Sequence, residues 1–174
     1  MYLKSVYKMA YKIRVVLDVE KDVIRDILVN ETINLEDLHY IIAKSFGFQG
    51  LEMASFYKTN EDWEQGEEIP LFDMSEDGTA MCMHNCLLKD VLKKEGDKLI
   101  YVYDFLSMWT FFVELSKIMD TKEKDLPKIM LSIGTKPDKA PEKEFTAEEE
   151  FDELDEFDDE ADIENLDEFD YDNY

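Results

Sequence analysis

The residues best suited to metal chemistry are two thiols and an imidazole in the segment Cys82-Met83-His84-Asn85-Cys86. In an extended strand, Cys82, His84 and Cys86 would lie on one face, and thiolate together with imidazole suits zinc. A closed zinc site needs four ligands, however, and the only other histidine in the sequence is His39. The spacing also differs from that of known zinc motifs. We therefore predict two ordinary thiols, with no metal site and no cofactor.

Four further residues, Arg25, His39, Asp104 and Trp109, carry side chains that could form a functional cluster. His39 could act as a general base, but a base needs a partner to orient it, and the sequence pairs none with it. Asp104 ends the strongest predicted strand, where a short acidic side chain commonly hydrogen-bonds the following turn. Arg25 alternates with apolar residues and would need an acid in the core, for which Asp104 is a candidate. We favour structural roles for all four residues and predict no catalytic site. A pocket that joined Arg25, His39 and Asp104 would instead indicate an enzyme.

The elements that position these residues include five stretches in which apolar and polar residues alternate with strand periodicity. They are residues 9–19, 23–29, 51–58, 98–105 and 108–118. The connection between the last two is very short, which predicts an antiparallel hairpin. In this hairpin the inward face begins at Trp109, which we expect to be substantially buried.

A helix is predicted to begin after Asn34, because asparagine is a favoured N-cap and Asp37 occupies the third helical position. Gly47 is expected to end this helix in a left-handed conformation. A second, shorter helical turn is expected at residues 87–92. Strands that pair as hairpins, with helices set apart from them, predict an α+β fold in which helices pack on one side of a mainly antiparallel sheet.

Composition excludes several classes of protein. The chain has 174 residues, of which 43 are acidic and 19 basic, for a net charge of −24. A hydrophobic content of 45% allows a core, yet the apolar runs are too short for a membrane span, and the first residues lack a secretory signal. Two cysteines fit a reducing cytoplasm, and a polyanion repels nucleic-acid phosphates. We predict a cytoplasmic protein with no membrane association and no direct nucleic-acid binding.

Most of the excess negative charge lies in residues 142–174, which hold 18 acidic side chains and one lysine. Blocks of like charge usually stay unfolded, so we predict a domain at residues 1–135, a Pro/Lys linker at 136–141 and a disordered acidic tail. Composition favours a tail that aids solubility, whereas its apolar residues favour binding to a basic, apolar-grooved protein partner, and both remain open. Those residues are Phe151, Leu154, Phe157, Leu166 and Phe169.

Four stretches of the chain match, in their order and spacing, the sequence pattern of a known family. The segment Tyr101-Val102-Tyr103-Asp104-Phe105, followed by Trp109, is similar to a Tyr-x-Tyr-Asp-Phe-Gly-Asp-x-Trp signature. The other three are Tyr11–Ile13 with Val23–Val29, Ile33–Ile42 with Phe46-Gly47-Phe48, and Leu88–Leu92 with Glu95-Gly96-Asp97. Together, over roughly residues 10–118, they resemble the plasmid pRiA ORF-three-like family.

The resemblance implies an α+β fold and an uncharacterised bacterial protein, without an established activity. The sequence departs from the family pattern after Phe105, where the aspartate of the signature and a later histidine are replaced. We therefore expect a non-catalytic cytoplasmic interaction module with an acidic tail. One alternative is an acidic DNA mimic, or a regulator of a nucleic-acid-binding partner linked to mobile elements. The other is an enzyme of unknown reaction that uses His39 and Asp104.

Overall fold

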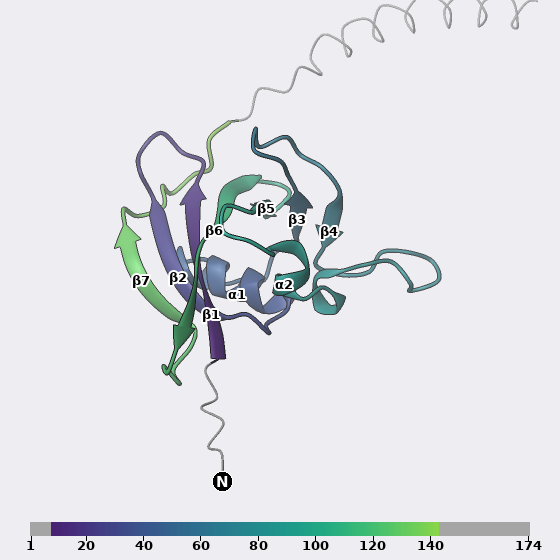
Figure 1. Cartoon of the computed structure of the whole chain (residues 1–174). Coiled ribbons are helices and arrows are strands. Elements are labelled where there is room, and N and C mark those ends of the chain that lie inside the picture. The colour runs from purple at the N-terminus through teal and green to yellow at the C-terminus, as the bar shows by residue number, and fades with distance from the viewer. Residues whose placement is uncertain (1–7, 143–174) are drawn as a thin grey trace, which may run out of the picture. The chain divides into compact units, whose positions relative to one another are not determined.

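The computed structural model describes residues 8–142, in which one seven-stranded sheet curves around a single longer helix (Figure 1). The strand order is β4-β3-β5-β6-β1-β2-β7, and every neighbouring pair is antiparallel. The elements are β1 (Lys8–Leu17), β2 (Ile24–Asn30), α1 (Leu35–Ser45), β3 (Ala54–Lys58), β4 (Glu68–Pro70), the 3-10 turn η1 (Met83–Asn85), α2 (Leu88–Val91), β5 (Lys98–Tyr103), β6 (Trp109–Thr121) and β7 (Lys128–Ile133). Across this described range, none of the helices has the length and apolar character needed to cross a bilayer.

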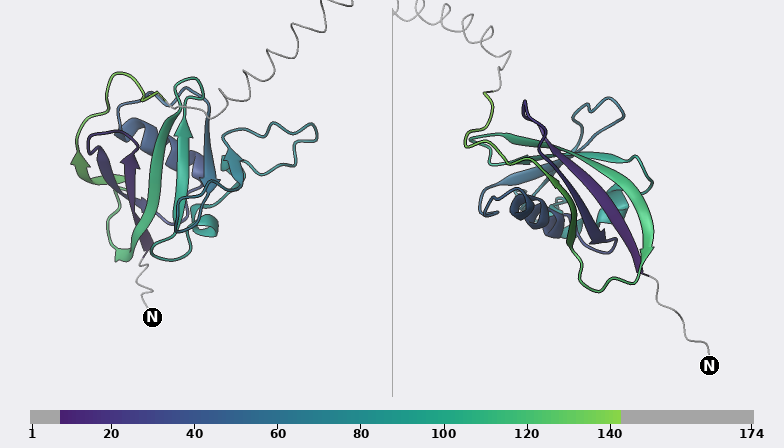
Figure 2. Two further views of the ribbon diagram at one scale, coloured as in Figure 1. Left: turned by 90° about the horizontal axis from the view of Figure 1, so that it is seen from above. Right: turned by 90° about the vertical axis from the view of Figure 1, so that its left-hand side faces the viewer.

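The fold is mainly β, so the prediction of an α+β fold with helices packed on one side of the sheet is wrong. Helix accounts for only about 13% of the structure, because α2 is a single turn of four residues. The sheet also extends further than the sequence patterns indicate, through a 13-residue β6 and two additional strands, β4 and β7. As Figure 2 shows, α1 lies within the curve of the sheet as one inserted element, and no helical layer forms.

The helix α1 has the boundaries that its sequence predicts. The Asn34 side chain accepts a hydrogen bond from the Asp37 backbone N–H at 2.8 Å, and the Asp37 carboxylate accepts one from the Asn34 N–H at 3.4 Å. This reciprocal capping box satisfies two N–H groups that the first turn would otherwise leave unpaired. Gly47 follows the helix with φ +90°, a conformation that glycine adopts at little cost.

The predicted hairpin of β5 and β6 is confirmed, with Tyr103 opposite Trp109 at its closed end. The side chains of β6 that face the helix alternate along the strand and are at most 5% exposed. They are Trp109, Phe111, Val113 and Leu115, so the predicted burial of Trp109 is also confirmed. The ring of Phe46, just after α1, packs against Phe111 with their centroids 4.9 Å apart, which joins the helix to the sheet.

The strand β7 forms one end of the sheet, and all six of its residues are exposed. It pairs with β2 on one side only, so its other edge has no strand partner in the described part of the chain. Gly134 follows β7 with φ +71°, and a side chain there would collide with the backbone oxygen of Asp22. Only glycine therefore lets the chain leave β7 so close to the β1–β2 turn.

Candidate functional site

The four candidate residues have different partners, although Asp104 and Trp109 lie at the same end of the β5–β6 hairpin. Arg25 is only 6% exposed, and its guanidinium donates to four backbone carbonyls, those of Ile24, Ser45, Ile133 and Gly134, at 2.9 to 3.0 Å. The same group lies 4.8 Å from the centroid of the Phe46 ring. The sequence suggested Asp104 as the partner of Arg25, but the guanidinium pairs with backbone carbonyls instead. Carbonyl oxygens, including one at the negative C-terminal end of α1, take the place of the expected acid.

His39 is completely buried on the inner face of α1. Its Nδ1 atom lies 2.5 Å from the hydroxyl oxygen of Tyr101 on β5, whereas its Nε2 atom is buried without a hydrogen-bond partner. Burial lowers the pKa of the imidazole to about 4, and an interaction with the backbone of Gly50 opposes this shift only in part. His39 is thus a neutral ring in the core, remote from any sheet edge. A substrate would have to displace the core to reach it.

The buried imidazole predicts a loss of stability in acid. In the unfolded chain the pKa of His39 has its ordinary value of 6.5, and in the folded protein it is about 4. Between these values the unfolded state binds more protons, so the contribution of His39 is complete above pH 6.5 and is lost as the pH falls toward 4. We expect a loss of about 3 kcal/mol over this interval. Urea unfolding at pH 7.0 and pH 4.5 measures it.

The matched control for this titration is the second histidine. His84 is exposed, so His84→Gln removes an imidazole outside the core and provides the variant with which His39→Gln is compared. His39→Gln keeps a hydrogen-bonding group beside Tyr101 but does not titrate, so its stability should fall less between pH 7.0 and pH 4.5. Equal pH dependence in wild type and His39→Gln would contradict a neutral buried imidazole.

Asp104 organises the turn of the β5–β6 hairpin. It has φ +61°, its backbone oxygen accepts from Ser107 and Met108, and its carboxylate accepts from the Leu106 N–H at 3.1 Å. Its own N–H donates to Met53 at 2.8 Å. The hydrogen bond that the turn donates to this carboxylate is the one expected from the sequence. These contacts assign Asp104 to the turn and not to a pair with His39.

Trp109 lies in an aromatic cluster at the same end of the hairpin. Its ring packs edge-to-face on Phe48 at 5.1 Å between centroids, and Phe48 in turn packs on Tyr103 at 4.9 Å. The Lys136 ammonium lies 4.9 Å from the Phe48 centroid and 5.8 Å from the Trp109 centroid. The cluster therefore joins the hairpin to the segments after α1 and after β7. Its rings pack against one another.

The cysteine-rich segment forms a turn, not a strand. Met83–Asn85 is the 3-10 turn η1, with Cys82 and Cys86 buried at its ends and His84 exposed between them. The imidazole therefore does not share a face with the thiols. Among the residues that the structure describes, no group of three or more histidine, cysteine and acidic side chains is placed to hold a metal ion.

The proposed partner-binding residues of the tail, Phe151, Leu154, Phe157, Leu166 and Phe169, lie outside the described residues. The tail, its disorder and its partner therefore remain predictions from the sequence.

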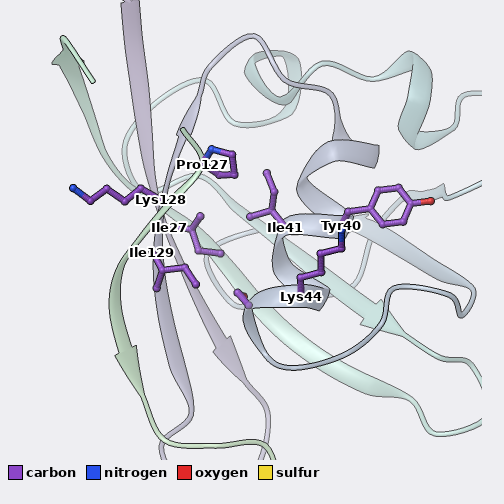
Figure 3. A pocket seen from close by; sticks show the side chains of 8 residues that line it. Ile27, Tyr40, Ile41, Lys44, Pro127, Lys128 and Ile129 are labelled. Atoms are coloured by element: carbon purple, nitrogen blue, oxygen red, sulfur yellow. The ribbon is translucent and has the colours of Figure 1, made fainter. Parts of the chain in front are cut away.

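A cavity of about 360 Å³ lies between α1 and the edge of the sheet formed by β2 and β7 (Figure 3). Ile27, Ile41 and Ile129 bring apolar side chains to it from β2, α1 and β7 respectively. The remaining lining residues are Tyr40, Lys44, Ser45, Pro127 and Lys128. This site is absent from the sequence prediction, because β7 itself is absent from it. The signal that could have found β7 is the short apolar run Ile129-Met130-Leu131, with Ile133 two residues later, between a proline and a glycine.

The cavity has a basic rim on an otherwise acidic domain. Residues 1–141 carry a net charge of −7, yet both charged residues that line the cavity, Lys44 and Lys128, are cationic. Lys128 pairs with the exposed Glu123 at 3.3 Å, and within residues 8–142 no ion pair involves Lys44. An apolar group that carries negative charge is therefore the kind of ligand that this surface would attract.

These features define a mainly-β domain that is centred on one capped helix and leaves an apolar cleft at one end of its sheet. The chain belongs to the plasmid pRiA4b ORF-3-like protein family, whose model matches residues 9–171. The resemblance inferred from the four sequence stretches is thereby confirmed. The fold also occurs in the crystal structure of a protein of unknown function from Methanosarcina mazei Go1. The TM-score is 0.60 at 22% identity, over 74% of this chain and 72% of that one, which shows a shared fold and no more. Comparison with the curated proteins found no significant match.

Proposed function

We propose that this protein is a non-catalytic, cytoplasmic interaction module that binds a segment of a partner protein in the cleft between α1 and β7. The observation that carries the proposal is the cavity of about 360 Å³ beside an edge strand whose six residues are all exposed. Pockets that hold ligands typically measure about 300–1,000 Å³ and are mostly apolar with a few polar groups, and this cavity has that composition.

The exposed surface of β7 supports the same proposal. Ile129, Met130, Leu131 and Ile133 are each between 36% and 49% exposed. Apolar side chains that cluster on an edge strand favour association, and proteins commonly protect such edges with charge, proline or a covering segment. A bound partner segment would bury these side chains and fill the cavity at once. In this proposal the acidic tail is a second arm, whose own partner is a basic protein.

The proposal is tested by selecting peptides from a random display library on the immobilised full-length chain. Selected peptides should bind the wild type and should bind Ile129→Glu at least tenfold more weakly, because the new carboxylate enters the cavity. The matched control is Met130→Glu, since Met130 is equally exposed on the same strand but does not line the cavity. Binding of all selected peptides that is insensitive to Ile129→Glu, or failure to select any peptide, would rule out the cleft as the binding site.

A further inference from the structure

We infer that the partner segment binds as an extended strand paired with the free edge of β7, with an apolar side chain in the cavity and carboxylates beside it. This inference rests on the proposed function, because it specifies the conformation and the chemistry of the segment that the cleft binds. It is carried by the geometry of β7, by the position of the cavity next to that strand, and by the charge of the rim.

β7 pairs with β2 in an irregular register. Leu131 is opposite Asp26 and Ile129 is opposite Ile27, so Met130 is an extra residue on β7. Because neighbouring residues of β2 face opposite sides of the sheet, this bulge turns Ile129 to the side of the core and Leu131 to the outer side. The bulge is thus the reason why Ile129 reaches the cavity while the strand remains at the edge.

A strand added to β7 would lie next to the cavity. A strand paired with β7 would lie about 4.8 Å beyond it, and a side chain opposite Ile129 would be about 5 Å away on the same face. On that face lies the cavity, which Ile41 lines from α1. One apolar side chain of the added strand would therefore enter the cavity, while its backbone would pair with an edge that has no strand partner within residues 8–142.

The cavity and the edge of β7 suit a bound strand better than a bound helix. A helix that binds in a groove contacts it through residues spread over two or more turns, which requires a long apolar trough. Here the cavity is a compact space, and the apolar surface next to it follows β7, whose hydrogen-bonding edge a helix would leave unpaired. Addition of a strand uses both features, because backbone pairing supplies affinity and the cavity supplies specificity.

The positive charge at the cavity favours a segment with negative charge. Lys44 and Lys128 are the charged groups at the cavity, while the domain as a whole is acidic. Because successive residues of a strand face opposite sides, carboxylates next to the apolar residue would lie on the outer side of the sheet, where Lys128 points, and would compete with Glu123 for Lys128. A lysine-rich segment would instead bring like charges together at the same place.

The test uses a fluorescein-labelled ten-residue peptide that alternates isoleucine and glutamate, with binding to the full-length chain measured by fluorescence anisotropy. A peptide that alternates isoleucine and lysine should bind at least tenfold more weakly. The isoleucine–glutamate peptide N-methylated at every amide should also bind at least tenfold more weakly, because neither edge of its backbone can then donate hydrogen bonds to β7. In hydrogen exchange, the amides of β7 that point away from β2 should gain protection from the unmodified peptide alone.

Two variants of the protein test the charge. Lys128→Glu should weaken binding of the isoleucine–glutamate peptide at least fivefold, because its glutamates would face this side chain, whereas Lys117→Glu, on the exposed part of β6, should leave binding unchanged. Self-association of the chain through β7 in sedimentation equilibrium would assign the edge to a second copy and overturn the inference. Stronger binding of a peptide of residues 149–160 than of the designed strand would assign the edge to the acidic segment of this chain and overturn it too.

The outcomes separate this inference from the proposed function. If the peptides selected on the chain require Ile129 but are basic, helical or insensitive to N-methylation, the strand inference is wrong and the interaction module stands. If no peptide binding depends on Ile129, both are wrong.

Discussion

Replacing Arg25 with alanine is expected to lower the free energy of unfolding by at least about 3 kcal/mol, because it removes a buried guanidinium that donates four partly buried hydrogen bonds. The guanidinium joins three segments that are far apart in the sequence: the start of β2, the last residue of α1, Ser45, and the end of β7 at Ile133. A domain of this size is held together by roughly 5–15 kcal/mol, so the change is severe. Chemical unfolding monitored by circular dichroism measures it.

The pattern among substitutions identifies the cause. Arg25→Lys keeps the charge, but one ammonium cannot reproduce the planar fork that reaches Ser45 and Gly134 together, so it should recover only part of the loss. Lys117→Ala removes an exposed cation from β6 and should change the free energy of unfolding by less than about 0.5 kcal/mol. If Arg25→Ala were as stable as Lys117→Ala, the four hydrogen bonds would not hold these segments together.

Sequence reasoning succeeds where the determinants of structure are local. The N-cap pair of Asn34 and Asp37 fixes the start of α1 through contacts within one turn, and Gly47 fixes its end through backbone conformation. The hairpin of β5 and β6 follows similarly from a short connection and a regular alternation that begins at Trp109. None of these features depends on where the rest of the chain lies, so the printed residues are sufficient to predict them.

The sheet edges were missed because their strands depend on distant partners. β4 has three residues and exists through its pairing with β3, while β7 is exposed throughout and pairs with β2, about a hundred residues earlier. An exposed strand lacks the alternation that burial imposes, so periodicity could not identify it. The bulge at Met130 further disrupts any period of two. Without β7 there is no cleft, and for that reason the proposed binding site appears only in the folded chain.

The surroundings of His39 and of Arg25 differ in how far the sequence could predict them. Burial of His39 was predictable, because residues 35, 38, 39, 42 and 43 form one helical face, and all five are buried in the structure. The pairing of Arg25 was not predictable, because its partners are carbonyl groups, which every residue carries and no side-chain pattern reveals. Polar residues with unusual positions in a sequence can thus be ordinary parts of a core, while the functional surface lies elsewhere.

Replacing Trp109 with alanine is expected to give the other large effect, a loss of about 3–5 kcal/mol in the free energy of unfolding. Trp109 is 5% exposed and packs on Phe48 at 5.1 Å, so the substitution removes the largest ring of the cluster that closes the β5–β6 end of the core. Much of the variant should be unfolded or insoluble. The soluble fraction, its melting temperature and guanidinium unfolding by circular dichroism measure the loss.

The other tryptophan provides the matched control. Trp63 packs on Phe112, at 5.0 Å between ring centroids, but it is only partly buried and has φ +59°, a costly conformation for a bulky residue. Trp63→Ala should therefore cost much less than Trp109→Ala. Trp109→Phe retains an aromatic ring against Phe48 and should recover a large part of the loss, which links the effect to packing. The structural assignment of Trp109 would fail if Trp109→Ala melted like the wild type but no longer bound the peptides selected on the full-length chain, because Trp109 would then belong to a binding surface.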